Sequence, residues 1–245
     1  MANLLEFKKS DKDIGISVRT QIKGPESVLL NEFVEQYSDK LTSLKRHYAL
    51  FYEPLVPTGY PDLVVVTYNP EKYRSWTKKR TRLGILELKV LHHLYFIKGS
   101  TSEVIENQLG LNSKQLLRIL EKLLDASLLK RSKNCWLPVS LRTTYGINNI
   151  KTIEAKISDW SGVLQQANMN RLFSSESYVL SPVLTPSKRI ISEAEKSGVG
   201  IYSKPLGGSA KVVQKPFRSE GLPVSYASWL FNEWIGRQLL REQGI

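Results

Sequence analysis

The segment that most restricts the fold is Leu63–Tyr68, whose sequence LVVVTY is almost continuously apolar and rich in β-branched residues. A strand with one solvated face alternates apolar and polar residues, so an uninterrupted run indicates a strand covered on both faces. Another strand-like run precedes it at 47–57, with a turn expected at Pro57-Thr58-Gly59. Amphipathic helix patterns occur at 25–41 and 159–173. Together these patterns predict an α/β fold.

Charge is distributed unevenly along the chain. It has 35 Lys and Arg against 23 Asp and Glu, a net charge of +12. Residues 72–140 alone carry fourteen basic and five acidic residues, which is most of the excess. A concentrated positive charge favours a polyanionic partner, nucleic acid above all. The alternative is an ordinary basic protein without such a partner.

Cysteine and hydropathy patterns bear on the compartment. The single cysteine, Cys135, excludes an intrachain disulfide and fits a reducing cytoplasm. With only three histidines in the chain, it does not make a zinc site. No apolar run approaches the roughly 18 residues of a membrane span, and the first residues lack a secretory signal pattern. We expect a cytoplasmic protein without a membrane partner.

The region 83–138 has a helical pattern that ends in a basic hairpin. A helix stripe, a short helix over 101–110 and a longer helix starting at Asn112 or Ser113 precede two short strands. This order is typical of a winged helix-turn-helix. The basic segment 71–84 before it lacks apolar periodicity and is expected to be a linker.

A winged helix contacts DNA with its recognition helix and its wing, although many winged helices instead bind proteins. Both interpretations remain open for this region. The residues expected to contact DNA are Lys78, Lys79, Arg80 and Arg82 in the linker, Ser113, Lys114, Gln115 and Arg118 on the recognition helix, and Lys130, Arg131 and Lys133 in the wing.

The stretch TIEAKISDW, 152–160, indicates a strand on which Glu154 and Lys156 share one face and apolar residues the other. The pair is either a surface ion pair or two groups aimed at a third, such as a metal and a phosphate. Glu87 and Lys89 in LELKV have the same spacing. Because the apolar residues around them have helical periodicity, we favour Glu154 and Lys156.

A larger pattern appears when residues 72–145 are set aside. The remaining order is helix, strand, strand, strand, helix, strand, helix. Pro61 and Asp62 open the second strand, Glu154 begins an E-x-K on the third, and Gln166 follows in the next helix, LQQANMNRLF. In these features the chain resembles the PD-(D/E)XK nuclease superfamily, which has the restriction-endonuclease-like fold.

The resemblance covers roughly residues 20–70 and 145–215. It implies a mixed central sheet flanked by helices, with the winged helix inserted into it. The implied domains are 1–75 as the first part of the core, 76–144 as the insertion, and 145–245 as the second part with the C-terminal helix. The insertion would account for the gap of 92 positions between Asp62 and Glu154, a departure from the common pattern.

The activity implied by the resemblance is metal-dependent cleavage of DNA. A hard divalent cation, Mg²⁺ or Mn²⁺, polarises the phosphate and activates water, and it prefers oxygen ligands. A lysine removes a proton near neutral pH only if its pKa is lowered. The implied roles are metal binding by Asp62, Glu154 and the carbonyl of Ala155, orientation or deprotonation of water or contact with the phosphate by Lys156, and support of the site by Glu26 and Gln166.

The same residues leave two other classes of function open. One is a non-catalytic DNA-binding protein that retains the nuclease fold as a scaffold. The other, with less support, is a subunit that docks on a larger complex. A homodimer or partner subunits of such a complex also remain open.

Overall fold

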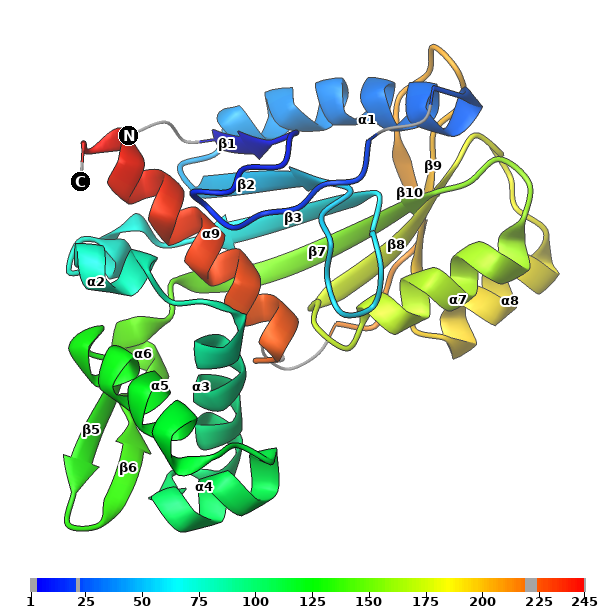
Figure 1. The fold of residues 1–245 in the computed structure, drawn as a ribbon. Helices are drawn as coiled ribbons and strands as arrows, with labels where there is room; N and C mark the ends of the chain where they lie inside the picture. Colours follow the sequence, from blue (N-terminus) through cyan, green and yellow to red (C-terminus); the bar gives the residue numbers. More distant parts are fainter. Residues whose placement is uncertain (1–3, 21–22, 219–223, 245) are drawn as a thin grey trace. The chain divides into compact units, whose positions relative to one another are not determined.

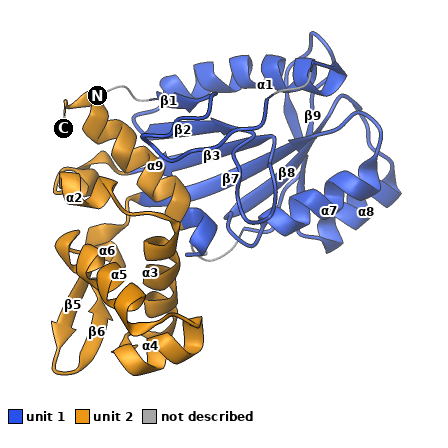
Figure 2. Ribbon diagram, in the orientation of Figure 1, with its two compact units in different colours: residues 1–68, 147–228 blue, residues 69–146, 229–245 orange. Residues whose placement is uncertain are grey.

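The computed structural model describes residues 4–20, 23–218 and 224–244 (Figure 1). They form a mixed α/β protein with a seven-stranded sheet, ordered β1-β2-β3-β7-β8-β9-β10, and a three-stranded sheet, ordered β4-β6-β5. The chain divides into two compact units, 1–68 with 147–228 and 69–146 with 229–245 (Figure 2). The second unit therefore interrupts the first between β3 and β7.

The large sheet is mixed. Strands β2, β3 and β7 are successively antiparallel, whereas β7, β8 and β9 are parallel to one another. Residues Leu63, Val64, Val65 and Val66 of the interior strand β3 are all buried, which confirms the strand predicted from the apolar run. The strands are β1 (Leu4–Phe7), β2 (His47–Tyr52), β3 (Leu63–Tyr68), β7 (Ile147–Ala155), β8 (Glu176–Ser181), β9 (Gly200–Ser203) and β10 (Lys211–Gln214).

Helices cover both faces of this sheet (Figure 1). Helix α1 (Pro25–Thr42) packs Leu29 and Phe33 against one face, where Ile153 of β7 joins the same core. Helices α7 (Trp160–Asn170) and α8 (Lys188–Lys196) form a separate core on the other face. Each fully buried Leu or Phe contributes about 1.5–3 kcal/mol. The apolar alternation of β7 thus directs Ile153 toward α1 and Glu154 toward α7.

Between residues 85 and 138, the second unit contains three helices and a small sheet. Its order is α3 (Ile85–Ile97), β4 (Ser100–Thr101), α4 (Ser102–Leu109), α5 (Ser113–Asp125), β5 (Leu129–Ser132) and β6 (Cys135–Pro138). The Asn112 side chain accepts a hydrogen bond from the Gln115 N–H at 2.9 Å, so Asn112 caps α5 as predicted. A short helix, α6 (Leu141–Thr144), leads back to β7.

The segment predicted to be a linker, 71–84, is folded, so that prediction was wrong. It contains a 3₁₀ turn η1 (Pro70–Tyr73) and a short helix α2 (Lys78–Thr81), and Tyr73, Trp76 and Arg80 are buried. The 3₁₀ turn and the short helix are each only four residues long, so neither leaves an apolar helical stripe in the sequence. Their packing partners lie far along the chain and are invisible to a local pattern.

Those partners include the final helix, α9 (Tyr226–Glu242). We expected this helix to belong to the first unit, with residues 145–245, but most of it belongs to the second. The Tyr73 hydroxyl donates to Asn232 Oδ1 at 3.1 Å. A Cβ at Gly236 would lie 2.1 Å from Trp76, so only glycine allows this approach. Among the described residues, no helix is both long and apolar enough to cross a membrane.

Candidate functional site

The pairing of β3 with β7 brings Asp62 and Glu154 together. Leu63 pairs with Ile153 in an antiparallel register, so the start of β3 lies beside the end of β7. The Ala155 N–H donates to Asp62 Oδ2 at 2.8 Å. Two of the predicted metal ligands, Asp62 and Glu154, therefore meet at one end of the sheet, and the third, Ala155, contacts Asp62 through its N–H.

The Glu154 carboxyl group is buried, with only 4% of the residue exposed. Asn170 Nδ2 donates to Glu154 Oε1 at 2.5 Å, and the Asn170 Oδ1 accepts from Thr58 Oγ1 at 3.4 Å. Burial and the nearby charge of Asp62 raise the pKa of Glu154 well above its ordinary value, and Asn170 offsets only part of this rise.

The Asp62 carboxyl group is partly buried and lies in the same electrostatic environment. Burial, with a smaller contribution from the charge of Glu53, raises its pKa to about 6, although the Ala155 N–H opposes the rise. Neighbouring carboxylates that resist ionisation are a donor set whose charge a divalent cation would neutralise. No group of three His, Cys, Asp or Glu residues within the described ranges forms a ready metal site, but Mg²⁺ often takes only one or two protein carboxylates.

Lys156 follows the last residue of β7, and its side chain contacts a different element from that of Glu154. Its Nζ lies 3.0 Å from Oε1 of Glu26 in the first turn of α1, whereas Glu154 contacts α7. The hydrogen bond that Lys156 donates to Glu26 raises the pKa of Lys156. This opposes its expected role as a base, since the amine stays protonated at neutral pH.

Gln166 lies on the exposed side of α7, and Asn170, one turn further on, contacts Glu154 in its place. Asn170 follows Val163 and Ala167 along the buried stripe of the helix. A polar side chain on an apolar stripe requires a hydrogen-bonding partner, so the stripe itself could have revealed Asn170.

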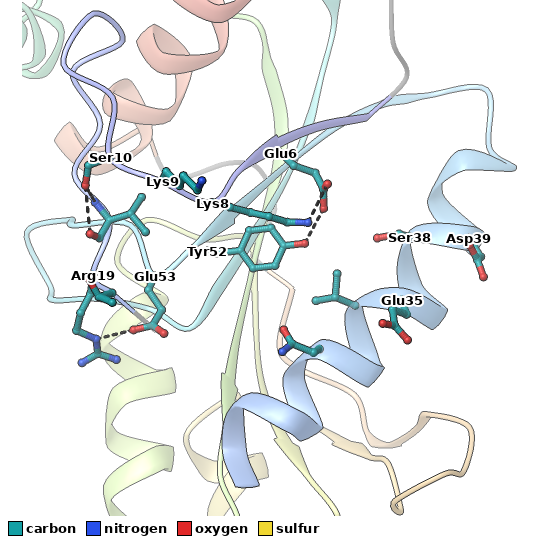
Figure 3. Close-up of a pocket in the computed structure, with 14 residues that line it drawn as sticks. Glu6, Lys8, Lys9, Ser10, Arg19, Glu35, Ser38, Asp39, Tyr52 and Glu53 are labelled. Carbon is teal, nitrogen blue, oxygen red and sulfur yellow. Dashed lines mark hydrogen bonds and ion pairs between the residues drawn. The ribbon is translucent and has the colours of Figure 1, made fainter. Parts of the chain in front are cut away.

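Two further charged residues complete the site and were missed in the sequence. Arg19 Nε donates to Glu53 Oε2 at 2.5 Å (Figure 3). Arg19 Nη2 also lies 3.9 Å from Asp62 Oδ1. Glu53 is buried and its backbone φ is +44°, a strained region for a residue with a side chain. As an acidic residue within the strand-like run 47–57, Glu53 gave a weak signal, and Arg19 gave none.

Two hollows meet at this ion pair. A cleft of about 410 Å³ is lined by Arg19, Glu26, Glu53, Asp62 and Ala155, among others. A larger hollow of about 1020 Å³ shares Arg19 and Glu53 and extends along α1 (Figure 3). Acidic and basic side chains both line the larger hollow, so it carries no single sign of charge. We call the smaller one the carboxylate cleft.

In the second unit, most residues expected to contact DNA are exposed. Arg80 is buried, with its guanidinium 2.8 Å from Glu233, and is withdrawn from the surface. The Ser113 hydroxyl donates to Glu106 of α4, and Gln115 is half-buried. The exposed residues of the set are Lys78, Lys79, Arg82, Ser113, Lys114, Arg118, Lys130, Arg131 and Lys133.

The rival pair, Glu87 and Lys89, lies on α3, as its helical periodicity predicted. Glu87 Oε2 accepts from the Gly84 N–H at 2.8 Å and its Oε1 lies 2.6 Å from Lys122 Nζ. These contacts cap α3 and join it to α5. They give Glu87 a structural role.

Comparison of the chain with family models found no match, and comparisons with curated proteins and with solved structures found none either.

Proposed function

We propose that this chain is a metal-dependent DNA endonuclease with a restriction-endonuclease-like core and an inserted winged helix. The observation that carries the proposal is the meeting of Asp62 and Glu154, two carboxyl groups with raised pKa values, at one end of a mixed sheet. The order α1-β2-β3-β7-α7-β8 supports it, because three antiparallel strands between helices and a parallel fourth strand are the layout that the family resemblance implies.

Asp62, Glu154 and the Ala155 carbonyl would hold Mg²⁺ or Mn²⁺. Their oxygen atoms suit a hard cation. A bound cation would also neutralise the unfavourable negative charge of the two carboxylates. The bound ion would polarise a phosphodiester and lower the pKa of an attacking water. Asn170 would orient Glu154 through the hydrogen bond described above.

Lys156 keeps its proton, so its proposed role is to hold the phosphate rather than to remove a proton. The element order α3-β4-α4-α5-β5-β6 supports a winged helix, with α5 as the recognition helix and β5-β6 as the wing. The exposed basic residues of α5 and the wing would contact the DNA backbone, and their binding would weaken as salt rises.

The direct test is cleavage of plasmid and branched DNA in Mg²⁺ or Mn²⁺. Wild-type protein should cut. The variants Asp62→Asn and Glu154→Gln should lose at least about 100-fold in rate, and Lys156→Ala should be strongly impaired. Glu193→Gln, which alters a carboxylate in the surface ion pair with Arg189 on α8, is the matched control and should retain its rate. Absence of cleavage by wild-type protein with every metal and DNA form, or full activity of the Asp62 and Glu154 variants, would refute the proposal.

The burial of Glu154 favours one alternative, a DNA-binding protein that keeps the fold without the chemistry. A carboxyl group that is 4% exposed and bonded to Asn170 is also a plausible structural group. This alternative expects salt-dependent DNA binding without hydrolysis. Calorimetry with Mn²⁺ separates the two, since only the endonuclease should bind the ion and lose it in Asp62→Asn.

A further inference from the structure

Arg19 is anchored through its backbone before its side chain makes any contact. Its N–H donates to the Glu53 carbonyl at 3.0 Å, and the Leu55 N–H donates to the Ser17 carbonyl at 2.8 Å. Between these bonds, Val18 forms an antiparallel bridge with Pro54. The segment around Arg19 is therefore paired with the chain that follows β2, and the guanidinium starts from a fixed position.

The side chain is also held in one direction. Nε donates to Glu53, and the guanidinium carbon lies 5.4 Å from the centre of the Tyr60 ring. Glu53 is buried and conformationally strained, so the acceptor itself is fixed. Because Nε is occupied, the two terminal amino groups form the part of the guanidinium that remains for a ligand.

The terminal amino groups lie where a substrate group would arrive. Arg19 lines the carboxylate cleft beside Asp62, at 3.9 Å between Nη2 and Oδ1, beyond hydrogen-bond distance. Its side chain is 49% exposed, in contrast to that of Arg80, which is 5% exposed and serves a buried ion pair. A fixed, half-exposed guanidinium with two parallel N–H donors matches two oxygens of a phosphate.

We infer that Arg19 binds the phosphate group of the substrate in the carboxylate cleft, and that Glu53 acts as the positioning residue for Arg19. The inference rests on the proposed function for the identity of the substrate, a phosphodiester of DNA. It adds a cation for the phosphate that no motif in the sequence indicates. Lys156 forms an ion pair with Glu26, which lines the cleft, and then need not hold the phosphate alone.

Cleavage kinetics form the first test. Removal of a donor to a developing charge costs about 100- to 1000-fold in kcat, so we expect a loss of this size in Arg19→Ala with the KM for DNA within about threefold. Arg19→Lys keeps the charge but not the fork and should recover less than about a tenth of the activity. Glu53→Gln should lose about tenfold, through misplacement of Arg19.

The chain offers a matched control. Arg189 forms an exposed ion pair with Glu193 at 2.8 Å on α8, and Arg189→Ala should leave kcat unchanged. If the sole role of Arg19 were to neutralise Asp62 and Glu53, Arg19→Lys would restore full activity. That result, or an Arg19→Ala variant that is folded and cuts within threefold of wild type, would overturn the inference.

A second measurement is independent of cleavage. The full chain is labelled with ¹⁵N at arginine, the Nε–H signal of Arg19 is assigned with Arg19→Lys, and thymidylyl-thymidine is added in Ca²⁺. Movement of this signal, without movement of that of Arg189, supports phosphate contact by Arg19 even if wild-type protein cuts no DNA. A signal that stays fixed while wild-type protein cuts DNA contradicts the inference and leaves the proposed endonuclease intact.

Discussion

Asn170 is the residue that fixes the direction of Glu154, because its amide donates to the buried carboxyl group. In Asn170→Ala this donor is lost, and we expect metal-dependent DNA cleavage to fall at least about tenfold. Gln166→Ala, one turn earlier on the exposed side of α7, should stay within about twofold of wild type. Initial rates at saturating Mg²⁺ give the comparison. Equal losses in both variants would contradict the assignment of Asn170.

Asp62 makes stability depend on pH with an unusual sign. Its pKa rises from an ordinary value of 3.8 to about 6 on folding, so between these values the folded chain binds more protons than the unfolded chain. The free energy of unfolding of the metal-free protein should therefore fall as pH rises from about 4 to about 6, by about 1–3 kcal/mol. The raised pKa of Glu154 acts in the same direction and extends the fall to higher pH.

Urea unfolding at pH 4.5, 6 and 7.5 measures this dependence. Asp62→Asn should flatten the slope and be more stable than wild type at pH 7.5, whereas the surface variant Glu193→Gln should keep the wild-type slope. Added Mg²⁺ should restore stability at pH 7.5, because the ion binds the folded state. If the wild-type protein instead became steadily more stable between pH 4.5 and 7.5, folding would not raise the pKa of Asp62.

At the residue scale, the sequence predicted the two carboxylates that lie on neighbouring strands. Asp62 and Glu154 were expected together because the family resemblance implies that both bind the metal. Their neighbours Leu63 and Ile153 are register partners. Lys156 and Glu26 were named separately, but their ion pair was not foreseen. Arg19 and Glu53 were not predicted as site residues, because their contact spans 34 positions and follows no periodicity.

At the element scale, α5 is expected to supply most of the affinity for DNA. Lys114 and Arg118 are exposed on it, one turn apart, and line a shallow groove with Lys122. The double variant Lys114→Ala/Arg118→Ala should bind DNA more weakly, and the log–log salt dependence should become shallower by about two units, roughly 0.9 per phosphate contact. Fluorescence anisotropy over a range of salt concentrations measures both quantities, with Arg189→Ala as the control. An unchanged salt slope would exclude these residues from the DNA interface.

Periodicity predicted most elements correctly and failed where elements are short. The helices at Pro25, Asn112 and Trp160 and the strands β2, β3 and β7 follow their patterns. The segment 71–84 was taken for a linker because it is basic and has few apolar residues. Its buried residues, Tyr73, Trp76 and Arg80, do have the i, i+3, i+7 spacing of a helix face, but one of the three is an arginine. Their burial depends on residues about 150 positions later, which only tertiary structure brings near.

At the scale of the whole molecule, the second unit is built from two separate stretches of chain that an ion pair joins. Arg80 Nη2 donates to Glu233 Oε1 of α9 and to the Thr144 carbonyl, both at 2.8 Å, and the guanidinium stacks 3.5 Å from the Trp76 ring centre. Removal of α9 would therefore expose the core of this unit. If a partner subunit no longer bound after α9 was removed, the loss could come from unfolding alone. Partner binding through α9 should therefore be tested with point variants.

The ion pair gives a prediction about how the two units unfold. Arg80→Ala leaves the Glu233 carboxylate buried without its partner, which costs about 3–5 kcal/mol, whereas a double replacement by apolar residues, Arg80→Met/Glu233→Leu, should cost far less. Hydrogen exchange measured by mass spectrometry should show faster exchange in α3 and α9 of Arg80→Ala, with β3 and β7 of the first unit protected as in wild type. Uniformly faster exchange over both units would mean that they unfold as one, and that the inserted unit and α9 stabilise the sheet that carries Asp62 and Glu154.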